Sequence, residues 1–416
     1  MNSRNDRTDL VDTWNGKVEE WPKVRFGDVC EIVARQVDPK LDQYAKLPHI
    51  SGVNIESGTG RLLFLNTAAE DKVTSNKYLF YSGDVLYSKL RPYLRKALAV
   101  DFQGVCSADM YPLRVDRDYL DPEFTAWLLI SDSFTKYADG ESRRARMPKL
   151  NREQLFNWTA QIPPLSKQKT INSYIKWQFD KYIRSRMAAK AQLEAAETLP
   201  AAYLRSIFQG PEAESWLILP LGEAGEISSG ITLGRRVSDR ETRPVPYLRV
   251  ANVKDGHLDL SDVNEIDATE AEIEKLRLKS GDLLLTEGGD ADKLGRGTFW
   301  EGQIPDCIHQ NHIFRIRFDP SRFCHRFVAA QIASPYGKAY FLAHAKQTTG
   351  IATINQKVLS AFPLMVPPVR EQKRIALMLD ARRTEAERVH SALADRLKAI
   401  ERLPASILSR AFIGAR

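Results

Sequence analysis

A long helix-like segment occurs twice in this chain, and this repeat constrains the fold more than any other feature. The first copy begins with Pro-Pro-Leu-Ser-Lys-Gln at 163–168, and the second begins with Pro-Pro-Val-Arg-Glu-Gln at 367–372, 204 positions later. Their ends keep the same offset, with Leu-Pro-Ala and a final Phe-x-Gly at 199–210 and 403–414. A match without insertions indicates a duplicated unit rather than two unrelated amphipathic helices.

Apolar residues recur in both copies at steps of three, four or seven, while Lys, Arg and Glu fill the other faces. This period predicts a helix with one apolar stripe, typical of a helix that pairs with a partner helix. The stripe of the first copy is Ile171, Ile175, Phe179, Ile183, Met187 and Leu193, and that of the second is Ile375, Leu379, Ala386, Val389, Leu393, Leu397 and Ile400.

The ends of the predicted helices carry start and stop signals. We expect Ser166 to act as the N-cap of the first copy, because it follows a Pro pair. From Ser166 to Thr198 the helix would be roughly 50 Å long at about 1.5 Å per residue. Pro200 and Pro404 should kink or break the two copies.

A fainter repeat covers the rest of the chain. Ser-Gly-Asp-Val-Leu at 82–86 matches Ser-Gly-Asp-Leu-Leu at 280–284, at an offset of 198, and Cys106 with Leu113-Arg114 matches Cys307 with Phe314-Arg315, at an offset of 201. The offset grows in small steps, as expected if short loops were inserted between shared elements. We therefore predict a globular half at 1–164, a repeated helix at 165–210, a second globular half at 211–367 and a second repeated helix at 368–416.

Each globular half mixes predicted strands and helices. Short apolar runs at 84–87 and 282–285 follow Ser-Gly turns and indicate strands, as do residues 110–115 and 312–317. Residues 122–129 and 322–333 are typical of helices. The predicted fold class is therefore α/β (α+β), with a central, partly curved sheet in each half.

Composition sets broad limits on function. The chain has 416 residues, a formal net charge of +7 and four cysteines without a Cys-x-x-Cys pair, and its pI is about 9.1. The moderate basic excess favours a polyanionic partner, and the cysteine usage suits a reducing cytoplasm. The N-terminal stretch has no apolar segment typical of a signal peptide, and no apolar run is long enough to span a bilayer.

Catalytic motifs are missing from the sequence. We find neither a GxxxxGK[ST] phosphate loop nor a GxGxxG turn, and no Asn/Asp-Pro-Pro-aromatic loop of adenine methyltransferases. Pro305-Asp306 with Glu371-x-Lys373 resembles a nuclease set only nominally, since its carboxylates lie far apart in sequence. A metal site could be formed by Cys307, His309 and His312 with Cys324 or His325, but we favour a buried cysteine at a strand start. We predict no catalytic residue, metal or cofactor in this chain.

Two segments of the first half look suited to DNA, because they concentrate cations and an aromatic ring. Lysine and arginine attract phosphates, and arginine can also read guanine. A solvated basic loop is the alternative interpretation. The candidate DNA-binding residues of this half are Lys89, Arg91, Tyr93, Arg95, Lys96, Arg143, Arg144, Arg146 and Lys149.

The matching places of the second half are more polar than basic. Glutamine and threonine can read base edges, and glycines let the backbone approach closely. The candidates here are Thr286, Gly288, Gly289, Lys293, Arg296, Gln347, Thr348, Thr349 and Gly350. Helices that repeat closely beside loops that differ are expected if each half reads a different DNA sequence.

The chain resembles the specificity subunits of type I restriction–modification enzymes from about Trp21 to its end. The resemblance is carried by the segment Gly-Asp-Val-Leu-Tyr-Ser-Lys-Leu-Arg-Pro-Tyr at 83–93, by Gln-Thr-Thr-Gly at 347–350, and above all by the paired Pro-Pro-x-x-x-Gln helices. It implies two target-recognition domains separated by two similar helices packed as an antiparallel coiled coil. Each domain would read one half of a bipartite target in double-stranded DNA.

The resemblance also implies partners. The helices would set the gap between half-sites and dock two methyltransferase (modification) subunits, which bind S-adenosylmethionine, and a motor/nuclease (restriction) subunit would join for cleavage. On this hypothesis the chain itself is a non-catalytic, cytoplasmic DNA-binding protein. The alternatives are a self-contained nuclease or methyltransferase that acts on DNA, or a non-modifying DNA-binding or coiled-coil scaffold.

Overall fold

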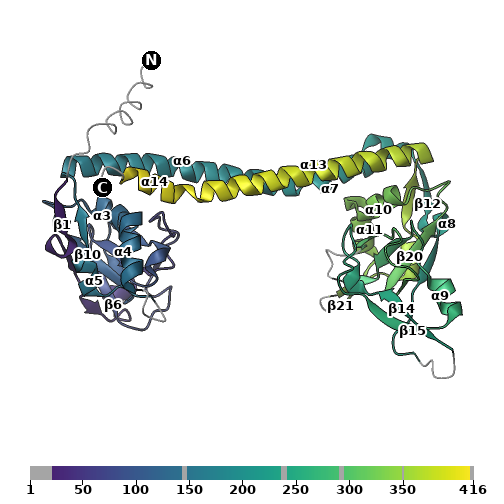
Figure 1. Cartoon of the computed structure of the whole chain (residues 1–416), viewed down its shortest axis with the longest axis horizontal. Coiled ribbons are helices and arrows are strands. Elements are labelled where there is room, and N and C mark those ends of the chain that lie inside the picture. Colours follow the sequence, from purple (N-terminus) through teal and green to yellow (C-terminus); the bar gives the residue numbers. More distant parts are fainter. Residues whose placement is uncertain (1–20, 143–147, 236–240, 290–294, 349–350, 413–416) are drawn as a thin grey trace, which may run out of the picture. The chain divides into compact units, whose positions relative to one another are not determined.

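The computed structural model describes residues 21–142, 148–235, 241–289, 295–348 and 351–412. The chain divides into two compact units, and the division crosses both long helices (Figure 1). Unit 1 combines the chain up to residue 191 with the segment from residue 394 onward, and unit 2 is residues 192–393. Each unit is described by itself below.

Unit 1 contains two main sheets. The four-stranded sheet has the antiparallel order β2-β10-β7-β8, and the five-stranded sheet has the order β3-β6-β9-β4-β5, in which β4 and β9 run parallel. Strands β1 and β11 form a separate antiparallel pair. The strands are β1 (Lys23–Arg25), β2 (Cys30–Ile32), β3 (Gln36–Val37), β4 (Pro48–Ile50), β5 (Asn66–Thr67), β6 (Lys77–Phe80), β7 (Val85–Ser88), β8 (Ala97–Ala99), β9 (Gly104–Cys106), β10 (Met110–Val115) and β11 (Thr159–Gln161). The shorter helices are α2 (Asp42–Ala45), α3 (Pro122–Leu129), α4 (Asp132–Ser142) and α5 (Arg152–Asn157).

Unit 2 repeats this plan. Its four-stranded sheet has the order β13-β20-β16-β18, and the sheet β15-β14-β19 again contains a parallel pair, β14 with β19. The strands are β12 (Leu217–Pro220), β13 (Gly225–Ser229), β14 (Arg243–Leu248), β15 (Asn264–Ala268), β16 (Leu283–Thr286), β17 (Gly288–Gly289), β18 (Gly297–Phe299), β19 (Ile308–His309), β20 (Ile313–Phe318), β21 (Lys346–Thr348), β22 (Ile351–Thr353) and β23 (Pro363–Val366). The shorter helices are α8 (Leu221–Ala224), α9 (Glu270–Leu276), α10 (His325–Ala333), α11 (Pro335–His344) and α12 (Gln356–Ser360).

The predicted mixed α/β (α+β) class is confirmed, and so are the individual elements. Strands β7 and β16 begin one residue after the predicted runs, β10 is found as predicted, and β20 begins one residue later than predicted. Helix α3 has the predicted bounds, and α10 is three residues shorter than predicted at its start. The Ser-Gly turns before β7 and β16 require glycine, since Gly83 and Gly281 have φ values of +88° and +92°.

The strand register corrects one part of the sequence alignment. Val85 pairs with Leu113, and its counterpart Leu283 pairs with Ile316, so the offset at this strand is 203 rather than 201. An ion pair with a buried aspartate follows the same register: Arg114 contacts Asp84 at 3.1 Å, whereas Arg317 contacts Asp282 at 2.7 Å. The counterpart of Arg114 is therefore Arg317 and not Arg315. The prediction was wrong because loop insertions cannot be located without the pairing.

The same shift changes the counterpart of Cys106. Ile50 pairs with Cys106 across parallel strands, and Leu248 pairs with His309 in the same way. Cys106 therefore corresponds to His309, not to Cys307. Both side chains are fully buried, so a thiol in one unit is replaced by an imidazole in the other.

The repeated helices are α6 (Leu165–Glu197) and α13 (Val369–Glu401), each followed by a short helix, α7 (Leu199–Phe208) and α14 (Leu403–Ala411). The predicted breaks are confirmed, because Pro200 and Pro404 lie in the first turns of α7 and α14. The N-cap prediction was wrong, since α6 begins at Leu165 and Ser166 lies inside its first turn. The proline ring fixes φ at a helical value, so the helix starts directly after the Pro pair.

The apolar stripe was predicted correctly for most of its length. Ile171, Ile175 and Phe179 are buried, but Met187 is 67% exposed. Ala189, which lies two residues later, is buried in its place. Ala189 takes the position that Leu393 holds in the second copy, so the stripe of the first copy continues with a small residue.

The glutamine of each Pro-Pro-x-x-x-Gln motif fastens the globular half to its helix. The buried Gln168 side chain accepts a hydrogen bond from the N–H of Asp121 at 2.8 Å. It donates to the carbonyls of Tyr119 and Pro163 at 2.7 and 2.8 Å. Gln372 repeats all three bonds, with Cys324, Arg322 and Pro367 at 2.8, 3.2 and 2.9 Å. The glutamine of the motif thus has a structural role, because its side-chain amide makes three hydrogen bonds that hold the globular half to its helix.

We expect Gln168→Ala to destabilise unit 1 by roughly 3 kcal/mol, because three backbone groups lose their hydrogen bonds to a buried side chain. Gln372→Ala should act in the same way on unit 2. Hydrogen exchange of peptides from α3 and α10, followed by mass spectrometry, would assign the loss to one unit. Equal effects of Gln168→Ala on both units would contradict this role.

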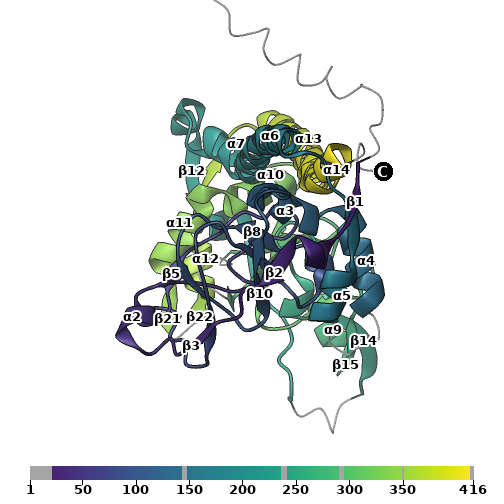
Figure 2. The ribbon, with the colours of Figure 1, turned by 90° about the vertical axis from the view of Figure 1, so that its left-hand side faces the viewer.

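Each core is completed by a helix from a distant part of the sequence. In unit 1, α3 lies between the sheet and the helices α6 and α14 (Figure 2). The Phe412 ring contacts the Phe124 ring of α3 at a centroid distance of 5.7 Å. In unit 2, Phe208, 204 positions earlier, contacts Phe327 of α10 at 5.4 Å. The start of α6 therefore shares a core with α14, and the start of α13 shares a core with α7.

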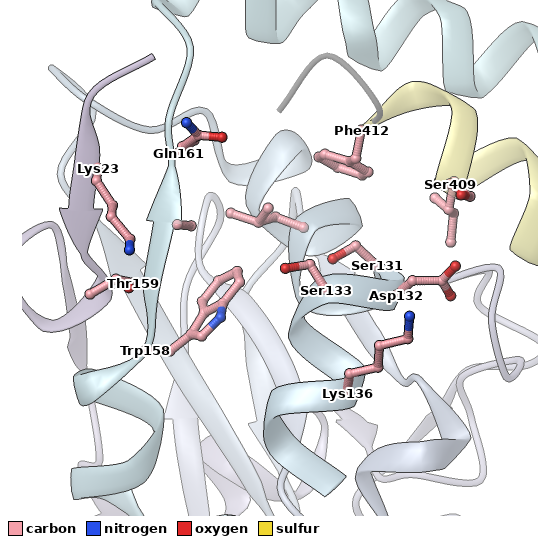
Figure 3. Close-up of a pocket in the computed structure, with 13 residues that line it drawn as sticks. Lys23, Ser131, Asp132, Ser133, Lys136, Trp158, Thr159, Gln161, Ser409 and Phe412 are labelled. Atoms are coloured by element: carbon pink, nitrogen blue, oxygen red, sulfur yellow. The ribbon is translucent and has the colours of Figure 1, made fainter. Parts of the chain in front are cut away.

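A cavity of about 550 Å³ lies in unit 1, between the end of α14 and the globular part of the unit. Figure 3 shows Phe412 and Ser409 above it, with Trp158 and Lys136 on the other side. Asp132 at its wall is paired with Arg95 at 2.6 Å.

Among the helices in the described ranges, none is both long enough and apolar enough to cross a bilayer.

Candidate nucleic-acid interface

The two basic segments of the first half meet in space. Leu90 forms a β-bridge with Lys149, and the N–H of Arg91 donates to the carbonyl of Pro148 at 2.8 Å. The segment 89–96 therefore lies beside Lys149, although about 55 residues separate them. Arg143, Arg144 and Arg146 lie outside the described residues.

The candidate side chains of this surface have different environments. Arg91 and Lys149 are exposed, and Tyr93 is 52% exposed. Arg91 and Arg95 flank a short 3₁₀ turn at Pro92–Leu94, and each has a φ of +50°. A positive φ is strained for arginine, so the surrounding contacts hold this turn in one conformation that presents Arg91 and Tyr93 to solvent.

The remaining cations of the segment are engaged with the protein. The Lys89 side chain is buried, donates to the carbonyl of Ala108, and lies 5.0 Å from the centre of the Tyr111 ring. Burial lowers the pKa of Lys89, and repulsion from Lys149 adds to the shift. Arg95 is paired with Asp132. Lys96 donates to the carbonyl of Gly52, so these three cations support the loop.

The polar segments of the second half also meet. Gly289 and Gln347 both pair with Ala352, on either side of β22 in a three-stranded sheet. Gly288 must be glycine, because a Cβ atom there would lie 2.6 Å from the Thr353 side chain. Gln347-Thr348 therefore lies in the same small sheet as the Gly-Gly pair. Lys293, Thr349 and Gly350 lie outside the described residues.

Thr286 and Arg296 belong to the base of this loop. Thr286 is buried, and its hydroxyl donates to the carbonyl of Arg296 at 3.3 Å. Arg296 is half-buried. The sequence pointed to both as candidates, yet in this structure Thr286 faces the protein interior.

One backbone framework supports both surfaces. The bridge between Leu90 and Lys149 corresponds to the pair Gly288 and Thr353. The N–H of Lys89 donates to Asp109, as the N–H of its counterpart Glu287 donates to His312, at 3.1 and 2.9 Å. Matching backbone contacts that carry different side chains are expected of two related domains that recognise different sequences.

The sequence search missed the ion pair of the second half. Glu287 takes the place of Lys89, and its carboxylate lies 2.5 Å from Nδ1 of the exposed His312. The sequence had suggested His312 only as a weak metal-ligand candidate. Its link to Glu287 depends on the shifted strand register, which the sequence does not reveal.

The sequence-based prediction also missed a second loop, in which both units have the same hydrogen bond to a buried asparagine. Asn54 and Asn252 are buried, and each side chain accepts a hydrogen bond at 2.8 Å from the N–H three residues earlier. In unit 1 this loop exposes Val53 and Phe64 next to the basic segment, since Lys96 reaches Gly52. Buried asparagines at matching positions are a signal that a pairwise alignment of the two halves could have found.

Comparison with known proteins assigns both halves to one family. The model of the type I restriction modification DNA specificity domain matches residues 18–195 and again residues 213–392. The specificity subunit of the type I restriction enzyme EcoDI from Escherichia coli is 33% identical over 196 residues, which is 47% of this chain and 43% of that protein. The EcoKI specificity subunit from Escherichia coli K12 is 26% identical over 41% of this chain and 37% of that protein. The matches thus span less than half the length of these relatives.

Two solved structures share the fold over nearly the whole chain. One, from work on complex assembly and conformational transition of the type I R-M system, has a TM-score of 0.69 at 21% identity, and the match covers 95% of this chain and 98% of that one. The other is the HsdS subunit from Thermoanaerobacter tengcongensis, with a TM-score of 0.65 at 21% identity, covering 95% and 97%.

Two similar α+β domains, each fastened to a repeated long helix, define a tandem domain protein with two surfaces built on one frame. The chain belongs to the type I restriction modification DNA specificity domain family, with two copies of that domain.

Proposed function

We propose that this chain is the sequence-specific DNA-binding subunit of a type I restriction–modification complex. Each domain reads one half of a bipartite target in double-stranded DNA. The observation that carries this proposal is the pair of family domains with matching backbone contacts and different side chains at the matching positions. The target-recognition domains comprise residues 1–164 and 211–367, and the helices at 165–210 and 368–416 set the gap between the half-sites.

The proposal includes partners that perform the chemistry. Two methyltransferase subunits, which carry S-adenosylmethionine, dock on the helices, and a motor/nuclease subunit joins for cleavage. The chain contributes DNA affinity and sequence choice and has no catalytic role. The complex acts on chromosomal DNA in the cytoplasm.

A methylome tests this function. The chain would be expressed with the methyltransferase subunit encoded beside it, in a host that lacks adenine methylation, and modified bases would be sequenced. We expect a bipartite motif with an unread gap that disappears without this chain. Modification by the purified chain alone would favour a self-contained enzyme, and no modification by two soluble, copurifying proteins would favour a non-modifying scaffold.

Residues of the two surfaces should differ in their effect. We expect Arg91→Ala to weaken binding to all DNA sequences and to reduce the salt dependence by about one phosphate contact. Gln347→Ala should relax sequence choice in the second half-site by about 1–3 kcal/mol per base pair and change total affinity less. Titrations of specific and random duplexes at several salt concentrations would distinguish the two. Equal loss on all DNA for Gln347→Ala would exclude base reading by this residue.

The helix pair can be tested as a ruler. One heptad inserted in α6 alone should mispair the helices and abolish modification. Matched insertions in α6 and α13 should restore a complex with a longer unread gap, read from the methylome. A gap that stays unchanged with matched insertions would contradict a spacer role.

A further inference from the structure

The contact between globular half and helix is filled by aromatic rings in unit 1. Trp127 of α3 stacks on Phe179 of α6, with ring centroids 5.3 Å apart and an interplanar angle of 11°. Tyr182 meets the edge of Phe179 at 6.0 Å. These rings belong to the main core of unit 1, so the space between α3 and α6 is closed by side chains of the chain itself.

The corresponding positions of unit 2 carry no aromatic ring. The offset of 203 between α3 and α10 is fixed by Phe124 and Phe327, and it places Ala330 where unit 1 has Trp127. The offset of 204 between the long helices is fixed by their glutamines. It places Arg383 and Ala386 where unit 1 has Phe179 and Tyr182. Three large rings are thus replaced by two alanines and an arginine.

A cavity of about 890 Å³ occupies this place in unit 2. Its apolar lining comes from α7, α10, α13 and β18 and comprises Leu204, Phe299, Ala329, Ala330, Ala333 and Leu379. Volumes in this range are typical of ligand pockets in proteins. Ala330 and Arg383, which take the places of Trp127 and Phe179, both line this cavity.

The rim of the cavity is charged, but its charges pair with one another. Arg326 contacts Asp380 at 2.9 Å, and Lys338 contacts Asp255 at 3.1 Å. The Arg326 guanidinium also lies 5.0 Å from the centre of the Phe299 ring. A ligand therefore need not supply charge. It would gain from apolar contact inside and from cation–π contact with arginine at the mouth.

We propose that this cavity is a binding site for a neutral aromatic side chain, tryptophan or tyrosine, of a partner protein. The side chain takes the place that Trp127 occupies in unit 1, where the same frame holds an indole presented by a helix. Aromatic anchors that fill a pocket inside a polar rim dominate many protein interfaces. Because unit 1 fills its own site, a partner anchored here distinguishes unit 2 from unit 1. This proposal goes beyond DNA recognition and does not depend on it.

The test uses the full chain and two probes, 5-fluoroindole and the capped tripeptide N-acetyl-Ala-(5-fluoro)Trp-Ala-amide, both observed by fluorine NMR. We expect saturable binding of both at about millimolar dissociation constants. The double variant Ala330→Trp/Arg383→Phe rebuilds the stack of unit 1 and should weaken both at least tenfold. Thermal unfolding should show that this variant is folded.

A matched control opens the equivalent site of unit 1, which Trp127 fills. Trp127→Ala in unit 1 removes the indole and should add a second binding site for 5-fluoroindole, so the stoichiometry rises from one to two. Absence of binding to the natural chain, or binding that the double variant leaves unchanged, would overturn the proposal. Binding of 5-fluoroindole without the tripeptide would also overturn it, since the site would then accept only free small molecules.

Discussion

Phe412→Ala at the end of the chain is expected to destabilise unit 1 by about 3–5 kcal/mol while leaving unit 2 unchanged. The Phe412 ring is 9% exposed and packs on Phe124, nearly 290 residues earlier in the sequence. Its neighbours Leu408 and Ala411 are fully buried in the same core. Hydrogen exchange of peptides from α3 and α10 would report the loss in each unit separately.

The matched variant is Phe208→Ala, which should produce the opposite pattern. Phe208 packs on Phe327 and is 2% exposed, so its loss should lower protection in unit 2 and spare unit 1. A stronger form replaces residues 403–412 by residues 199–208, the equivalent segment. This exchange should retain much of the stability, because the Phe and Leu contacts recur. Loss of protection in unit 2 after Phe412→Ala would contradict the assignment of α14 to unit 1.

Unit 2 should lose stability in acid to a greater extent than unit 1, because the His309 imidazole is fully buried. Burial and the nearby Arg315 guanidinium lower the pKa of His309 to about 4. In the unfolded chain a histidine has a pKa of about 6.5. Stability from the neutral imidazole is therefore complete above pH 6.5 and is lost as pH falls toward 4, by about 3 kcal/mol in all.

His309→Cys tests this effect with the residue that unit 1 uses at the same position. Burial raises the pKa of the Cys106 thiol, so a buried thiol there stays neutral throughout the acid range. The free energy of unfolding of unit 2 would be measured in urea by hydrogen exchange at pH values from 7 to 4. As the pH is lowered, it should fall steeply for the natural chain and less steeply for the variant. Two parallel pH profiles would exclude His309 as the cause.

The features that could be predicted from the sequence are those that a few neighbouring residues determine. Pro-Pro before each helix, Pro after it and Ser-Gly before β7 and β16 each fix a backbone conformation within a few residues, so their positions were correct. The mixed fold class followed from these elements. Arg315 was misaligned because the insertion that shifts the register lies in loops whose lengths carry no pairing information.

The orientation of single side chains could not be predicted in the same way. Lys89 and Arg91 lie two residues apart in a basic run, yet the first is buried against Tyr111 and the second is exposed. The difference arises from a turn with positive φ and from the distant residue Lys149, which forms a β-bridge with Leu90. The candidate surfaces were therefore predicted as segments, while the residues that face solvent required the fold.

The order of synthesis matters for a chain in which α14 completes the core of unit 1. The described core residues of unit 2 are all present once Leu379 has been made, but the core of unit 1 lacks Ile407, Leu408 and Phe412 until residue 412 has been made. At about 5–20 residues per second, the roughly 200 residues between Phe208 and Phe412 take about 10–40 s to synthesise. During this interval the N-terminal domain presents an unfinished apolar surface to chaperones and proteases. Nascent chains stalled before residue 403 should therefore be cleaved in unit 1 first.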